Sequence, residues 1–211
     1  LIAEALDVLA RRVLEDDTSA VRVACVAAAV QVAGTDVKKR DAALALRFLR
    51  PAVKSLDVAV RQAALRQLEH GAEAGQSEVL VSLFNDRDVT VRAEAVELYS
   101  KRVIEHAAPV GPLDDVLRGG ARELMLPAAE GVAHLRGVSA LRPLLLYSRA
   151  GEDGQRERAL LALGTLGDAR ALSELETVAA GGTPEAPTEP SMVWAAVEGL
   201  GRLAGRLPDG E

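Results

Sequence analysis

Val21-Arg22-Val23-Ala24-Cys25-Val26 is the first of six similar hexapeptides, and this internal repeat decides the fold. Each later copy keeps the apolar frame, and all but the last keep arginine near the start. The copies are Val60-Arg61-Gln62-Ala63-Ala64-Leu65, Val91-Arg92-Ala93-Glu94-Ala95-Val96, Ala121-Arg122-Glu123-Leu124-Met125-Leu126, Gln155-Arg156-Glu157-Arg158-Ala159-Leu160 and Met192-Val193-Trp194-Ala195-Ala196-Val197. Their spacing of roughly 30–40 residues is typical of a repeat built from two helices.

Each repeat contains two amphipathic helical segments joined by a tight turn. Ala159, Leu163 and Leu166 fall at i, i+4 and i+7, which places them on one face of a helix. Gly167 is suited to the left-handed conformation that ends a helix, and Asp168 is suited to cap the next one. We call the helix that starts with the hexapeptide the first helix and its follower the second helix. The pattern predicts stacked antiparallel helix pairs.

The repeat resembles the HEAT family, and is most similar to short bacterial HEAT-like repeats of the phycobilisome-lyase type. The resemblance covers residues 18–206 and implies an all-α solenoid of stacked antiparallel helix pairs. In that family a ladder of aspartates and arginines runs along the repeats. Its matching positions here are Arg22, Asp57, Arg61, Asp88, Arg92, Arg122 and Arg156. Asp57 and Asp88 each stand four residues before an arginine, a spacing that allows a direct pair. No acid stands at that place before Arg122, so the ladder should be weak there.

The repeat limits predict a single array over residues 1–211. Complete pairs are expected at about 18–54, 57–84, 88–118, 121–149 and 153–180, with partial repeats at 1–15 and 189–206. The proline-rich stretch 181–190 is expected to be a mobile linker. The apolar helix expected at 1–15 is the second helix of a partial repeat and lacks a polar cap, and the chain starts without Met, so we expect a fragment of a longer protein.

Composition restricts the class of protein further. The 211 residues are 49% hydrophobic and 27% charged, which indicates an ordered chain, and the net charge of -6 disfavours nonspecific nucleic-acid binding. A single cysteine, Cys25, excludes an intrachain disulfide and fits a reducing compartment. No uncharged stretch is long enough for a membrane span. We expect a cytoplasmic protein, and its preference for arginine over lysine favours a bacterial source.

No motif with a known chemistry occurs in the sequence. His70, His106 and His134 each follow the apolar part of a first helix, in no spacing that binds zinc. There is no nucleophile motif and no glycine-rich phosphate loop. The sequence therefore predicts neither an enzyme nor a metal or cofactor site.

Basic side chains gather on one predicted second helix, Val37 to Lys54. At 100° per residue they share a stripe about 100° wide, opposite the apolar residues. The stripe consists of Lys39, Arg40, Arg47, Arg50 and Lys54. One interpretation is an ordinary solvated face. The other is a binding site for an acidic partner, since second helices line the concave surface of HEAT-like arrays.

Three functions remain open at this level. The leading hypothesis is a non-catalytic scaffold within a larger protein, which binds a protein or acidic peptide on its concave helical surface. A nucleic-acid-binding HEAT-like module is the alternative, although no groove of basic and aromatic residues is evident. A chromophore lyase or pigment-binding protein is the third, and would need an apolar pocket with stacking aromatics. Aromatics are only 2% of the chain.

Overall fold

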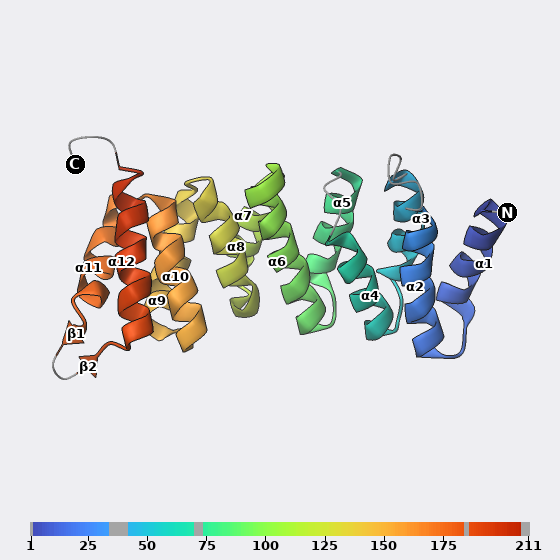
Figure 1. The fold of residues 1–211 in the computed structure, drawn as a ribbon, viewed down its shortest axis with the longest axis horizontal. Coiled ribbons are helices and arrows are strands. Elements are labelled where there is room, and N and C mark those ends of the chain that lie inside the picture. Colours follow the sequence, from blue (N-terminus) through green and yellow to red (C-terminus); the bar gives the residue numbers. More distant parts are fainter. Residues whose placement is uncertain (1, 34–41, 70–73, 184–185, 208–211) are drawn as a thin grey trace. The chain divides into compact units, whose positions relative to one another are not determined.

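The computed structural model describes residues 2–33, 42–69, 74–183 and 186–207. The chain divides into two compact units, Leu1–Tyr99 and Ser100–Glu211. Within each unit, successive helices run in opposite directions and pack side by side (Figure 1). The predicted all-α fold of stacked antiparallel helix pairs is confirmed.

The first unit is built from helices throughout its described part. They are α1 (Ile2–Glu15), α2 (Ser19–Ala33), α3 (Ala42–Ala52), α4 (Val58–Leu68), α5 (Ala74–Ser82), the 3-10 turn η1 (Leu83–Asn85) and the first part of α6 (Val89–His106). In its core, Phe48 of α3 packs on Ala29 of α2 and on Leu9 of α1. The ring of Phe84 meets that of Tyr99 edge to face, with ring centres 5.5 Å apart.

The second unit continues from the end of α6 with the same alternation. It contains α7 (Gly111–Gly119), α8 (Arg122–His134), η2 (Val138–Ala140), α9 (Leu141–Ala150), α10 (Asp153–Leu166), η3 (Ala169–Ala171), α11 (Leu172–Ala179) and α12 (Pro190–Ala204). Two strands of two residues, β1 (Gly182–Thr183) and β2 (Ala186–Pro187), pair antiparallel within the expected linker. Among the described residues, these are the only strands.

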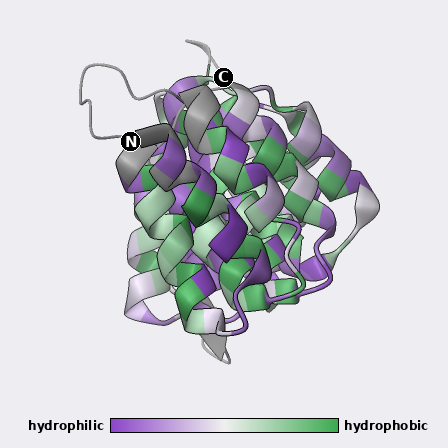
Figure 2. Cartoon of the chain, turned by 90° about the vertical axis from the view of Figure 1, so that its right-hand side faces the viewer, coloured by the Kyte–Doolittle hydropathy of each residue, from purple (hydrophilic) through white to green (hydrophobic). Residues whose placement is uncertain are grey.

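Local sequence explains where the helices begin and end. Asp57 caps α4 by accepting a hydrogen bond from the backbone N–H of Ala59. Gly167 takes the expected left-handed conformation, with φ of 72°, and ends α10. Arg136 holds the equivalent place after α8, with φ of 58°, although its side chain makes that conformation costlier than glycine does. Along the helices hydrophobic and hydrophilic residues alternate, as Figure 2 shows.

Close packing of first helices shapes the second unit. Leu160, Leu163 and Leu175 are fully buried between α10, α11 and α12. Gly164 of α10 lies against the backbone of Gly199 of α12, and a Cβ atom at Gly164 would overlap that backbone. Small residues at this crossing let the two helices approach each other closely.

Candidate functional site

The aligned arginines of the first unit share one local contact. In each of three repeats the guanidinium donates a hydrogen bond to the carbonyl of the residue six positions earlier. These bonds run from Arg22 to Asp16, from Arg61 to Ser55 and from Arg92 to Asp86. Each arginine thereby fixes the loop that leads into its own first helix, where the backbone carbonyls need partners.

Arg22 and Arg61 also reach forward to an aspartate of the next repeat. Arg22 forms an ion pair with Asp57 at 2.7 Å. Arg61 holds Asp86 through two bonds, Nε to Oδ2 at 2.8 Å and Nη2 to Oδ1 at 2.9 Å. The spacing of Asp57 and Arg61 would allow these two to pair directly, but Asp57 pairs with Arg22 and Arg61 pairs with Asp86. The ladder connects neighbouring repeats because a guanidinium at the start of one first helix faces the loop before the next.

Asp86 was missed in the sequence, although a signal was present. It stands six residues before Arg92, as Asp16 stands six before Arg22. In both loops this aspartate accepts the backbone N–H two residues on, at 3.0 Å from Thr18 and 2.9 Å from Asp88. Aspartate often forms a turn of this kind, in which its side chain binds the backbone two residues on. In this turn the second carboxylate oxygen of Asp86 accepts a hydrogen bond from Arg61.

Burial separates the two forward pairs. The Arg61 and Asp86 side chains are 3% and 7% exposed, whereas those of Arg22 and Asp57 are 21% and 18% exposed. The hydroxyl of Ser19 and the guanidinium of Arg22 stabilise the charged carboxylate of Asp57 and lower its pKa from 3.8 to about 2. Asp88 instead binds its own helix start through Thr90 and Val91, which lowers the pKa of its carboxyl.

In the second unit the aligned arginines have other roles. Arg156 donates to the carbonyl of Ser148 at 3.1 Å, eight residues earlier. Arg122 has an exposed side chain, and its carbonyl accepts the hydroxyl of Tyr147. Ion pairs between helices of this unit come from other positions, with Arg158 on Glu130 at 2.6 Å and Arg149 on Glu174 at 2.6 Å.

The basic stripe of the second helix is partly described. Lys39 and Arg40 lie outside the described residues. Arg47 and Arg50 lie on α3 with exposed side chains. Lys54 is also exposed, but α3 ends at Ala52, so Lys54 lies in the turn that follows and does not continue the helical stripe. Pro51 is the penultimate residue of the helix, which fits this ending.

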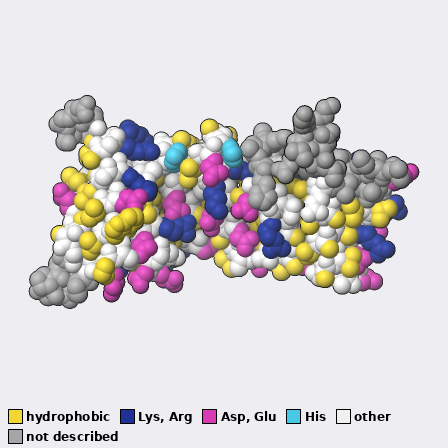
Figure 3. Space-filling view, in the orientation of Figure 1, with side chains coloured by type: hydrophobic (Ala, Val, Ile, Leu, Met, Phe, Trp, Pro, Cys, Tyr) yellow, Lys and Arg dark blue, Asp and Glu magenta, His cyan; other side chains and the backbone are white. Residues whose placement is uncertain are grey.

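Acidic side chains of neighbouring helices stand beside the two α3 arginines. Arg47 is 3.8 Å from Asp7 of α1, and Arg50 is 3.3 Å from Glu78 of α5. All four side chains are between 58% and 74% exposed. Ion pairs this long and this exposed contribute about 0–1 kcal/mol. Figure 3 shows basic and acidic side chains interspersed on the face it draws. The guanidinium groups of α3 are therefore accessible and weakly held.

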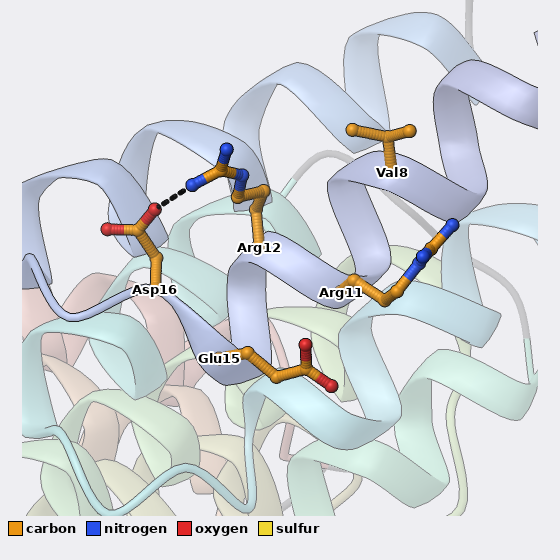
Figure 4. A pocket seen from close by; sticks show the side chains of 5 residues that line it. All are labelled: Val8, Arg11, Arg12, Glu15 and Asp16. Carbon is orange, nitrogen blue, oxygen red and sulfur yellow. Dashed lines mark hydrogen bonds and ion pairs between the residues drawn. The ribbon is translucent and has the colours of Figure 1, made fainter.

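Two open hollows of the described surface are lined by several charged side chains. One, of about 320 Å³, lies against α1 and is lined by Val8, Arg11, Arg12, Glu15 and Asp16. Arg12 points to Asp16 and binds it at 2.7 Å, while Arg11 points away (Figure 4). A backbone bond from Thr18 and this arginine lower the pKa of Asp16. Of the four charged side chains that line this hollow, Arg12 and Asp16 are bound to each other.

A second hollow lies among the C-terminal ends of α8, α10 and α12. It measures about 380 Å³ and includes His134, Thr165, Arg202 and Arg206. Arg206 donates to the carbonyl of His134 at 3.4 Å, and Arg202 donates to the hydroxyl of Thr165 at 3.2 Å. Cations near a helix C-terminus stabilise the helix by interacting with its dipole. The contacts of Arg202 and Arg206 indicate this structural role.

Two of the three histidines lie at the ends of first helices, as expected. His106 and His134 are the last residues of α6 and α8, and His70 lies outside the described residues. Within the described ranges, no three His, Cys, Asp or Glu side chains are grouped so that they could hold a metal ion. In the same ranges, no helix combines the length and the apolar character that crossing a membrane requires.

The fold is a helical-repeat architecture, and two solved structures are similar to it. YibA of Escherichia coli, known from an X-ray structure, is similar with a TM-score of 0.73 at 15% identity, over 96% of this chain and 69% of YibA. A designed armadillo repeat protein is similar with a TM-score of 0.53 at 16% identity, over 94% of this chain and 99% of the design. Neither a protein-family model nor a curated protein matches the sequence.

Proposed function

We propose that this chain is a non-catalytic protein-interaction scaffold that binds an acidic segment of a partner through the second-helix surface around α3. The observation that carries the proposal is the state of Arg47 and Arg50. Their guanidinium groups are 71% and 58% exposed and make only long contacts with acids. Lys54 adds a third exposed cation at the end of α3, and by sequence Lys39 and Arg40 belong to the same set.

The contrast with the ladder supports this assignment. Arg61, which stabilises the fold, is buried and engaged by four acceptor atoms at 2.8 to 3.2 Å. Arg47 and Arg50 instead carry most of their five N–H donors into solvent. An acidic partner would replace Asp7 and Glu78 as the acceptors. Because exposed pairs contribute little, breaking them costs about 0–1 kcal/mol each.

Charge favours a peptide over a nucleic acid as the partner. The chain has a net charge of -6, so its overall field repels a long polyanion. A short acidic segment senses the local cations of α3 more than the distant acids, because salt screens charges beyond about 8 Å. Stacking platforms for bases are also scarce, since four of the five aromatic side chains are buried and Trp194, the exposed one, lies on α12 of the second unit, whereas α3 belongs to the first.

The experiment compares capture of proteins from a source lysate by wild type and by a charge-reversed variant, Arg47→Glu, Arg50→Glu and Lys54→Glu together. The matched control reverses three exposed arginines on or beside first helices, Arg66, Arg87 and Arg122. We expect the first variant to lose the proteins that wild type and control retain, with an unchanged helical circular dichroism signal. If both variants capture the same proteins as wild type, the α3 cations are only solvated.

A further inference from the structure

The single tryptophan of the sequence lies on the surface of the last described helix. Trp194 is 67% exposed and Val197, three residues on, is 54% exposed. The other four aromatic side chains of the chain are between 2% and 7% exposed. A large aromatic side chain in water costs solvation free energy, and tryptophan is the residue most enriched among the energetic centres of protein interfaces.

The exposed face of α12 repeats a face that is covered elsewhere in the same unit. In the hexapeptide alignment Val197 corresponds to Leu160 of α10, and Gly201 corresponds to Gly164. Leu160 is fully buried and Gly164 touches the backbone of Gly199, because α12 packs on them. A Cβ atom at Gly201 would meet nothing within 4 Å. The face of α12 has the form that receives another helix, and no described residue covers Trp194, Val197 or Gly201 there.

The face is also complementary to itself. Trp194 lies three residues before Val197 and Gly201 lies four residues after it, so all three share one side of the helix. If a second α12 lies antiparallel across Val197, the bulky Trp194 of each helix falls on the open Gly201 of the other. Such a contact is isologous, with the same residues on both sides of a two-fold axis.

Charge does not oppose this pairing. Arg202 and Glu198 flank the face and are bound to each other at 2.5 Å across one helical turn. Arg202 also donates to Thr165 of α10 at 3.2 Å, which draws it toward its own unit. The centre of the face therefore brings no unpaired charge against its copy, and desolvating it carries no large electrostatic penalty.

We propose that the chain self-associates through α12, in an antiparallel two-fold contact that seats Trp194 of each copy on Gly201 of the other. This surface lies in the second unit and is separate from the acidic-partner surface of α3. One helix face is smaller than a standard interface, whose two partners together bury about 1,200–2,000 Å². The dimer is accordingly weak and concentration-dependent.

The experiment uses the single tryptophan as its probe. The mass in solution is followed by light scattering, and the tryptophan emission maximum by fluorescence, from about 1 μM to 1 mM protein. We expect the mass to rise from one copy toward two and the emission to shift to the blue over the same range, since the indole leaves water. Gly201→Leu fills the receiving site and should weaken association about 10-fold or more.

Gly154→Leu is the matched control, because Gly154 is also helical and open, with nothing within 4 Å of an added Cβ atom. It should associate as wild type does, and both variants should keep the wild-type helical signal and melting midpoint. Three results would overturn the proposal. They are a single copy with constant emission up to 1 mM, equal association of Gly201→Leu and wild type, and growth beyond two copies.

Discussion

The buried pair of Arg61 and Asp86 gives the sharpest stability prediction. Substitution Asp86→Ala removes the counter-charge of a guanidinium that is 3% exposed. The carbonyls of Ser55 and Leu56 still accept from Nη1, at 2.9 and 3.2 Å, but they carry no full charge. Breaking a buried pair in this way costs about 3–5 kcal/mol, because the remaining charge is left uncompensated.

The turn before α6 should add to that cost. The carboxylate of Asp86 also accepts the backbone N–H of Asp88 at 2.9 Å, and that bond disappears in Asp86→Ala. A hydrogen bond of this kind contributes about 0.5–1.5 kcal/mol. We therefore expect a loss of about 3.5–6.5 kcal/mol in the free energy of unfolding of the first unit, measured by urea denaturation followed by circular dichroism at 222 nm.

A matched pair of variants tests the reasoning behind this number. Glu78→Ala removes the acid from the exposed pair with Arg50, which is 3.3 Å long, and should cost about 0–1 kcal/mol. The double variant Arg61→Met with Asp86→Ala should recover part of the loss, since no charge is then buried. The reasoning is refuted if Asp86→Ala costs no more free energy of unfolding than Glu78→Ala. It is also refuted if the double variant loses more free energy of unfolding than the sum of the two single variants.

Three further predictions follow from the packing and the charges. Because the folded-state pKa of Asp57, about 2, lies below its ordinary value of 3.8, its stabilisation is present above pH 4 and lost as the pH falls from about 4 to 2. Asp57→Asn should flatten that part of a plot of urea midpoint against pH. Gly164→Ala should lower the melting midpoint strongly by clashing with Gly199, whereas Gly201→Ala should leave it unchanged or raise it. Leu163→Ala, which empties a fully buried site, should cost about 2–5 kcal/mol in a urea melt, and a cost below 1 would contradict its place in the core.

The repeat pattern was sufficient to predict the fold, because it acts through local structure. The hexapeptide fixes which residues of each first helix face inward, and residues such as Asp57 and Gly167 determine where helices begin and end. These are short-range effects that a single sequence displays. The resemblance to HEAT repeats rested on the same residues. It predicted the helix pairs but did not predict a specific function.

The sequence did not predict which side chains meet between repeats. Spacing within one helix suggested Asp57 with Arg61, but Arg61 reaches Asp86 across the packed face. The choice depends on the distance and rotation between neighbouring helices, which no single segment contains. The same limit applied to the basic stripe, because Asp7 and Glu78 come from helices on either side of α3.

Exposure of single residues was equally hard to predict. A helical wheel places Trp194 and Val197 on one face of α12, but it does not reveal whether neighbouring helices cover that face. That depends on α10 and α11, which pack on Gly199 and leave Gly201 open. Likewise Lys54 fitted a continuous helical stripe in the sequence, whereas α3 ends two residues earlier.

The most direct test of the proposed function measures binding of a defined acidic peptide. A fluorescently labelled polyglutamate peptide and a single-stranded DNA of equal charge are titrated with wild type and with the triple reversal at Arg47, Arg50 and Lys54, by anisotropy at about 0.05 and 0.15 M salt. The account predicts that wild type binds the peptide, more weakly at the higher salt and more tightly than it binds DNA, and that the reversal abolishes peptide binding. Tighter binding of DNA, or equal peptide affinity of wild type and reversal, would contradict it.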